Sequence, residues 1–342
     1  MPLSTELTDL LIERLGTRDD DCFDDLLKIL NWQPGSGQLN AEQFFDYIQH
    51  AATRLKMQHH LDRVGRNYGE TSYGEAEGLE YILGELQESL IDVIWHEQQK
   101  ALARLEPILS FTSHLSAGDA VVSFNYDKLV ESALDRHRIP WHHGLEDMQI
   151  EPYRVVVLKM HGSVDWVAMK RRIGDPQKMT RLFSKTDVNA EQFSPPPEDR
   201  EYAYELWRIN DAERNDRAIE GRDIQFADRF YDFGIAGLGS FKPLHQLPGS
   251  GLVWARAAGA LREAAKIIII GFSLSPFDGM ARLELARAMK ARLSEKRPPK
   301  DIVIVDPNAE SLAQSYLSVL QLPVTLVKSR AEEIREWSSV VA

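Results

Sequence analysis

The sequence predicts an α/β fold in which a Rossmann-like parallel sheet carries helices on both of its faces. Short, nearly continuous apolar runs recur along the chain, as in strands that are buried on both faces. Amphipathic stretches of helical length separate these runs. A polar residue or a glycine follows most of the runs directly. The expected strands cover residues 120–124, 154–161, 266–271, 301–306 and 324–327.

The first third of the chain is predicted to be helical, so that the strands of the sheet begin only after it. Residues 79–94 carry the most regular periodicity of the chain, and this long helix is expected to continue toward Leu105 and to end near Pro107. Gly65 to Gly74 reads as a loop before it. Shorter helices are predicted over residues 3–15, 20–32 and 40–55. We therefore expect a large helical insertion over residues 38–118.

The second half of the chain returns to strands and helices after a long interruption. Helices are expected over 128–138, 252–265, 278–293, 309–320 and 331–338. Residues 170–251 are charged and irregular in pattern, with a break at Ser194-Pro195-Pro196-Pro197. The predicted organisation is a single domain over 1–342. Its core consists of 119–167 and 251–342, and 168–250 form an insertion or small subdomain.

Charge and cysteine content exclude several classes of function. The net charge is −12, so the chain has no general attraction for nucleic acids or anionic membranes. The largest basic run, Lys170-Arg171-Arg172, reads as a solvated loop. The single cysteine, Cys22, supports neither a disulfide framework nor a zinc module of several cysteines. No apolar run reaches the roughly 20 residues of a spanning helix, and no signal peptide is evident. We expect a cytoplasmic protein.

Polar residues at the predicted strand ends form the candidate site. In an open parallel sheet, ligands bind at the carboxyl ends of the strands. Asn125 and His161 are expected at the centre of the site. Taken alone, each of the candidate residues could also have a purely structural role. Asp127 and Ser273 could cap helices, and a histidine before a glycine is often structural. The remaining candidates are Ser123, Gly162, Gly271, Asp306 and Asn308.

Four short motifs at these strand ends resemble the sirtuin superfamily. They are Ser123-Phe124-Asn125-Tyr126-Asp127, Lys159-Met160-His161-Gly162, Gly271-Phe272-Ser273-Leu274 and Val305-Asp306-Pro307-Asn308. Their order and spacing resemble the bacterial, defence-associated branch of NAD-hydrolysing proteins more than the protein deacylases. The resemblance extends from Val121 to Asn308, and the helical insertion before it also fits that branch.

The resemblance implies chemistry on NAD+, as a substrate, at the bond between nicotinamide and ribose. Asn125 would hold the ribose hydroxyls or the attacking water, and His161 would act as the general base. Asp127 would orient the pocket. The cofactor-binding set implied by the resemblance is Ser123, Gly162, Gly271, Ser273, Asp306 and Asn308. A base with a pKa near neutrality beside neutral polar groups suits a reaction that passes through an oxocarbenium-like sugar.

Three departures from the deacylase pattern direct the functional expectation. Deacylases hold a zinc ion with four cysteines, whereas this chain has only Cys22, so we expect no metal and a zinc-free small subdomain. Phe124 stands where deacylases have glutamine. The family's opening strand with its Gly-Ala-Gly-x-Ser phosphate loop has no counterpart. We expect that this first strand of the sheet is missing because Met1 is an internal methionine of a longer reading frame or because the gene is truncated.

These features leave four functional hypotheses. The first is an NAD+ glycohydrolase that acts as an antiphage effector, and the second is a catalytically incomplete module that binds a nucleotide and a partner. An NAD-dependent deacylase or ADP-ribosyl-transferring enzyme is the third. A metal hydrolase built on His59-His60 or His142-His143 is disfavoured because adjacent helical residues point about 100° apart. The expected partners are NAD+ or a related nucleotide, a second copy of the chain or a defence-operon product, but neither nucleic acid nor a membrane.

Overall fold

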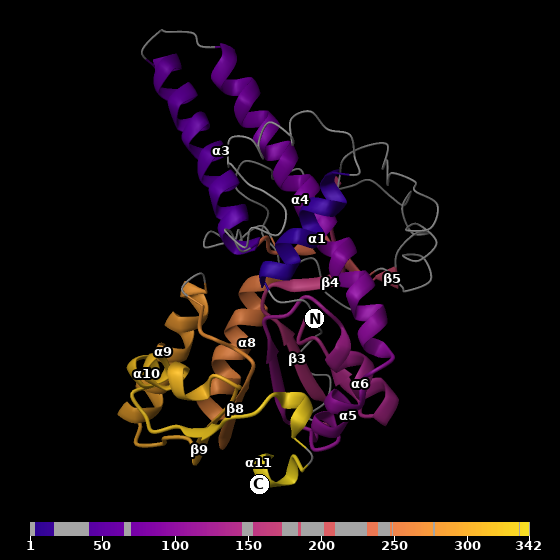
Figure 1. The fold of residues 1–342 in the computed structure, drawn as a ribbon. Helices are drawn as coiled ribbons and strands as arrows, with labels where there is room; N and C mark the ends of the chain where they lie inside the picture. Colours follow the sequence, from indigo (N-terminus) through magenta and orange to yellow (C-terminus); the bar gives the residue numbers. More distant parts are fainter. Residues whose placement is uncertain are drawn as a thin grey trace. The chain divides into compact units, whose positions relative to one another are not determined.

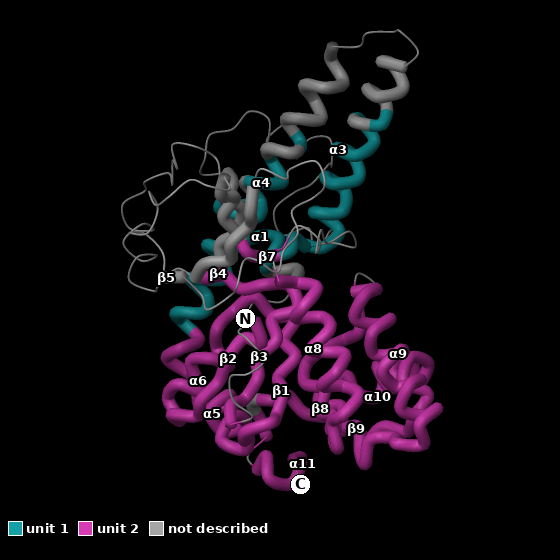
Figure 2. Tube along the Cα trace, turned by 180° about the vertical axis from the view of Figure 1, so that it is seen from behind, with its two compact units in different colours: residues 1–100, 236–243 teal, residues 101–235, 244–342 magenta. Residues whose placement is uncertain are grey.

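The computed structural model of the chain (Figure 1) divides into two compact units, which Figure 2 shows in different colours. One unit comprises residues 1–100 and 236–243, and the other comprises 101–235 and 244–342. The described residues are 4–16, 41–64, 70–145, 153–172, 184–185, 202–208, 231–238, 247, 249–275, 278–334 and 336–341. The predicted helix over 20–32 lies outside these residues.

The first unit is helical within residues 1–100 where the structure describes them. It contains α1 (Ser4–Gly16), α3 (Ala41–Val64) and most of α4 (Glu70–Leu102). Most of the buried side chains are apolar and recur at helical spacing, including Leu11, Phe44, Ile48, Leu86 and Leu90. The expected helices over 3–15, 40–55 and from 79 onward are confirmed in type. The predicted loop over 65–74 was too long, because α4 already begins at Glu70.

The second unit begins with a parallel sheet that carries the two central candidate residues. Its strands are β1 (Ala120–Ser123), β2 (Trp141–His142) and β3 (Val155–Lys159), in the order β1-β3-β2. Val121 pairs with Val157, and β-branched residues of this kind fit a pleated, buried surface. Helices α5 (Glu106–Thr112) and α6 (Leu129–His137) pack against each other, and α6 also covers β3 through Leu134.

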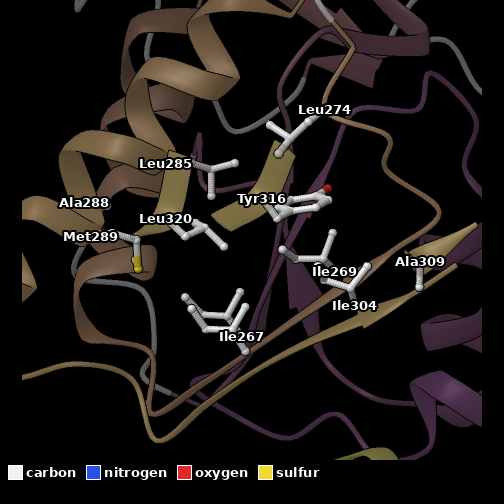
Figure 3. Close-up of a cluster of buried hydrophobic side chains, with 11 residues drawn as sticks. Ile267, Ile269, Leu274, Leu285, Ala288, Met289, Ile304, Ala309, Tyr316 and Leu320 are labelled. Atoms are coloured by element: carbon white, nitrogen blue, oxygen red, sulfur yellow. The ribbon is translucent and has the colours of Figure 1, made fainter. Parts of the chain in front are cut away.

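A second parallel sheet follows, with helices on one face and the C-terminal segment on the other. Its strands are β8 (Lys266–Ile270), β9 (Asp301–Val305) and β10 (Thr325–Val327), in the order β10-β9-β8. Helices α9 (Gly279–Ser294) and α10 (Ala309–Leu320) bury Leu285, Met289 and Tyr316 against Ile267 and Ile304 (Figure 3). These elements confirm the predicted alternation of strands and helices.

The C-terminal segment differs from the helix expected over 331–338. It contains a 3₁₀ turn, η4 (Ala331–Glu333), and a short helix, α11 (Ser338–Val341). Trp337 and Val340 pack on Val303 and Val305 of β9. The expected continuous helix is wrong because Trp337 anchors this segment on the sheet between two short turns, and such packing overrides local helical preference.

The sheet is divided where the sequence predicts one continuous layer. Among the described strands, β1 is hydrogen-bonded to β3, and β8 is hydrogen-bonded to β9. No strand pairing joins these two parallel sheets within the described residues. Helix α8 (Ser250–Glu263) packs on β3, on β1 and on α9, so it spans both sheets. The parallel α/β class is therefore confirmed, while the single layer is not found among these residues.

A third, antiparallel sheet lies in the region that we expected to be irregular. Its strands are β4 (Gly162–Arg172), β5 (Ser184–Lys185), β6 (Tyr202–Arg208) and β7 (Tyr231–Ile235), in the order β5-β6-β4-β7. Strand β4 thus runs across residues 167 and 168, where we expected the core to end and the insertion to begin. Pairing with distant partners stabilises these strands, and such pairing leaves little trace in local sequence pattern. Within the described residues, no helix is long and apolar enough to cross a membrane.

Candidate functional site

Asn125 and His161 lie at the carboxyl ends of neighbouring parallel strands, as predicted. Ser123, the last residue of β1, pairs with Lys159, the last residue of β3. The Met160 N–H donates to the Ser123 carbonyl at 2.9 Å and extends the pairing one step further. The segments that carry Asn125 and His161 therefore leave the sheet side by side.

Local hydrogen bonds hold the segment after β1 in place. The Asn125 N–H donates to Ser123 Oγ at 3.3 Å, which closes a short turn. The Val164 N–H donates to the Tyr126 carbonyl at 2.9 Å and ties this segment to β4. Asn125 is exposed, whereas Tyr126 is buried. Ser123 thus shapes the turn, and the Asn125 side chain is accessible to a ligand.

His161 lies in an aromatic setting beside a carboxylate that the sequence did not indicate. Its side chain is buried, and its ring packs edge-on against Phe124 at a centroid distance of 5.4 Å. The Tyr126 ring lies 6.1 Å away. Asp278 Oδ1 is 3.5 Å from His161 Nε2, and the Asp278 side chain is only 9% exposed. The sole sequence signal for Asp278 is its position directly before helix α9.

Asp127 caps a helix and faces a buried group of charges. Its Oδ1 accepts the Leu129 N–H at 3.0 Å at the start of α6. Lys159 Nζ donates to the Asp127 carbonyl and lies 3.6 Å from Glu131 Oε1. Burial raises the pKa of Glu131 above its usual value, although the Lys159 ammonium opposes the increase. The structural alternative considered for Asp127, helix capping, is therefore realised.

A second ion pair belongs to the same buried group. Lys128 Nζ lies 3.3 Å from Asp165 Oδ2, and Ser163 Oγ donates to Asp165 Oδ1 at 2.6 Å. The group joins α6 with the carboxyl end of β3 and with β4, directly around the loop that carries Asn125. Sequence reasoning missed the two ion pairs of this group, because each pair joins residues of different segments.

Gly162 has a backbone role that only glycine satisfies. Its φ is +82°, and a Cβ at this position would lie 1.9 Å from the carbonyl oxygen of Gly234. Gly162 pairs with Ile235, so β7 passes directly against the residue that follows His161. The sequence predicted Gly162 as a binding residue, and the structure shows it at a close approach of two backbones.

We expect Gly162→Ala to lower the free energy of unfolding by at least about 2 kcal/mol. Left-handed backbone costs a non-glycine residue about 1–2 kcal/mol, and the overlap with β7 adds about 1–3 kcal/mol of overpacking. Gly118→Ala is the matched control, since Gly118 has a φ of +92° but open space where its Cβ would lie. Urea denaturation measures both losses, and equal losses would contradict the proposed close contact.

The other predicted binding residues gather at the carboxyl ends of β8 and β9. The Gly271 N–H donates to the Val305 carbonyl at 3.0 Å, which places the two strand ends next to each other. Gly271 has a φ of +58° and open space beside it. Ser273 and Asn308 are exposed, and Asp306 Oδ1 accepts the Asn308 N–H at 2.7 Å. Gly271, Ser273, Asp306 and Asn308 therefore form a second group.

An aromatic pair connects the two groups of strand ends. The Phe124 ring, after β1, stacks on the Phe272 ring, after β8, at 4.3 Å and an interplanar angle of 1°. Trp254 of α8 contacts Phe124 edge-on and donates from Nε1 to the Met160 carbonyl at 3.2 Å. The stacked pair places the Asn125–His161 end and the Gly271–Ser273 end at one edge of the fold.

This fold and this edge define an α/β protein with a polar site at the carboxyl ends of parallel strands. Residues 119–193 match the family model of the SIR2-like domain. The match covers the motifs around Asn125 and His161, and it supports a sirtuin-type function related to NAD. A search of curated proteins found no match. Within the described part of the chain, no cluster of three or more His, Cys, Asp or Glu residues is placed to hold a metal ion.

Proposed function

We propose that the protein hydrolyses NAD+ at the bond between nicotinamide and ribose. The observation that carries this proposal is the adjacency of Asn125 and His161 on paired strands within the segment that matches the SIR2-like domain. Such domains use NAD+ as a substrate. The neutral amide of Asn125 is exposed at the site and suits hydrogen bonding to ribose hydroxyls or to a water molecule.

The reaction needs few groups from the protein. A water molecule attacks C1′ of the nicotinamide ribose, the C1′–N bond breaks, and nicotinamide leaves with the bonding electron pair. The water loses one proton, which His161 accepts as general base. The products are ADP-ribose, nicotinamide and one proton. Asn125 positions the water and the sugar, and the aromatic rings of Phe124 and Phe272 exclude bulk solvent beside them.

The group formed by Gly271, Ser273, Asp306 and Asn308 would bind the diphosphate and the adenosine ribose of NAD+. Ser273 can donate its hydroxyl to a phosphate oxygen, and the open space at Gly271 admits a close approach of ligand to backbone. Asn308 precedes helix α10 and lies exposed at the end of β9, where doubly wound folds contact a ribose. These assignments follow from position and residue chemistry.

Product analysis tests the proposal. We expect the purified chain, incubated with NAD+, to release nicotinamide and ADP-ribose in equal amounts without any acylated peptide. Product formation only when an acyl-lysine peptide is added would instead identify a deacylase.

The alternative is a nucleotide-binding module that does not turn over its ligand. The Phe124–Phe272 stack favours it, because the stack brings two apolar rings to the strand ends where we expect the ligand. Calorimetric binding of NAD+ without nicotinamide release would support this alternative. The proposed cellular role, antiphage defence in the cytoplasm with a second copy or a defence-operon product as partner, rests on the family resemblance.

A further inference from the structure

We infer that Asp278 is the positioning residue of His161, and that it holds the imidazole with the proton on Nε2. The carboxylate lies on the loop after β8, whereas His161 lies after β3, so the pair joins the two parallel sheets. The inference depends on the proposed function only for the reaction that His161 assists. The state of the imidazole itself can be measured without turnover.

The Asp278 carboxylate is directed to the histidine rather than to its own helix. Asp278 occupies the N-cap position of α9, where aspartate commonly accepts a hydrogen bond from the first turn. Here the side chain makes no such cap bond, and the helix begins with the Asp278 carbonyl accepting the Arg282 N–H at 3.1 Å. Asp278 Oδ1 instead lies 3.5 Å from His161 Nε2. Helix capping therefore does not explain the choice of aspartate.

Hydrogen bonds hold described residues on both sides of Asp278. Leu274 is buried, and its carbonyl accepts a hydrogen bond from Arg282 Nη1 at 2.8 Å. The Asp278 N–H donates to the Ser275 carbonyl at 3.0 Å. The second bond fixes the Asp278 backbone, from which the carboxylate extends toward His161. A distance of 3.5 Å is long for a hydrogen bond, and catalytic contacts of this kind often shorten when the substrate binds.

Burial makes the pairing energetically important. His161 and Asp278 have side chains that are 6% and 9% exposed, and an unpaired charge at such a depth is costly. An acceptor carboxylate at Nε2 favours the neutral tautomer that carries its proton there, and it also stabilises the imidazolium formed when His161 accepts a proton. Nδ1 is then the nitrogen that acts as base. Among the described residues, Tyr126 also places a titratable side chain beside His161, with its ring tilted at a centroid distance of 6.1 Å.

Nitrogen NMR of the protein labelled at histidine tests the inference. The chain has 10 histidines, and the His161 signals are assigned by their loss in His161→Gln. We expect neutral His161 in the wild-type protein to carry its proton on Nε2. In Asp278→Asn the amide can donate as well as accept, so a substantial share of the Nδ1–H tautomer should appear. The rate of nicotinamide release should fall through kcat while KM is retained.

Two further variants separate positioning from structural support. Glu284→Gln removes a carboxylate from the same helix, where it pairs with Arg287, and should leave the His161 signals unchanged. Asp278→Ser removes the carboxylate but keeps an oxygen that is able to cap the helix. We use it in place of Asp278→Asn if the asparagine variant does not fold. The His143 signals serve as an internal reference, because its Nδ1 lies 3.3 Å from the Val157 carbonyl. A wild-type Nδ1–H tautomer, or an unchanged tautomer in the Asp278 variants, would overturn the inference.

Discussion

His161→Ala is expected to lower the rate of nicotinamide release from NAD+ by about 100- to 10,000-fold, the usual contribution of a general base. His161 carries the only imidazole that the described structure places at the paired ends of β1 and β3. Asn125→Ala should reduce the rate as well, since it removes the amide that positions sugar and water. Because both residues serve one step, the double variant should lose much less than the product of the two single effects.

The assay follows nicotinamide by chromatography under saturating NAD+. His137→Ala is the control, because His137 is exposed on α6 and bonds to the Leu109 carbonyl away from the paired strand ends. Asn125 is exposed, so its substitution should change the free energy of unfolding by no more than about 0.5 kcal/mol. Activity that survives in both folded single variants would contradict the assignment of the site.

Lys159→Met is expected to destabilise the protein by about 3–5 kcal/mol, as when one partner of a buried ion pair is removed. The Lys159 side chain is 1% exposed and lies 3.6 Å from Glu131 Oε1, whose side chain is 2% exposed. The substitution also deprives the buried Asp127 carbonyl of its ammonium donor. Lys328→Met, which breaks an exposed pair with Glu310, should cost no more than about 1 kcal/mol.

A second substitution and a pH series identify why Lys159→Met lowers the free energy of unfolding. Replacing both partners, Lys159→Met with Glu131→Leu, should restore much of the stability, because no buried charge is left alone. Burial raises the folded-state pKa of Glu131 above its usual 4.5, so its contribution to stability is present below 4.5 and is lost as the pH rises through the folded value. Without Lys159 that pKa rises further. Urea denaturation should therefore show the Lys159→Met deficit growing from pH 4.5 toward neutrality, and a deficit independent of pH would contradict a charge effect.

The sequence predicted the parallel strands and the central pair because both depend on local patterns. The apolar runs around Val121 and Val157 identify strands by themselves, and the polar residues that follow them are placed at one edge by the parallel arrangement. This is why Asn125 and His161 could be expected side by side before the structure was known.

The missed residues depend on contacts between distant segments. Asp278 looks like an ordinary helix cap in the sequence, and only the fold shows its carboxylate beside His161. Lys159 reads as the polar end of a strand, yet its ammonium meets Glu131 on a helix. The antiparallel strands around Gly162 and Gly234 were missed for the same reason. Their backbones approach each other closely, and the sequence periodicity does not indicate this contact.

A crystal structure with ADP-ribose, the product of the proposed reaction, tests the central claim most directly. We expect the terminal ribose within hydrogen-bonding distance of Asn125 and His161, and the diphosphate toward Gly271 and Ser273. A terminal ribose bound away from Asn125 and His161, or no ADP-ribose bound at millimolar concentration, would contradict the proposal that the ends of β1 and β3 form the site of NAD+ cleavage.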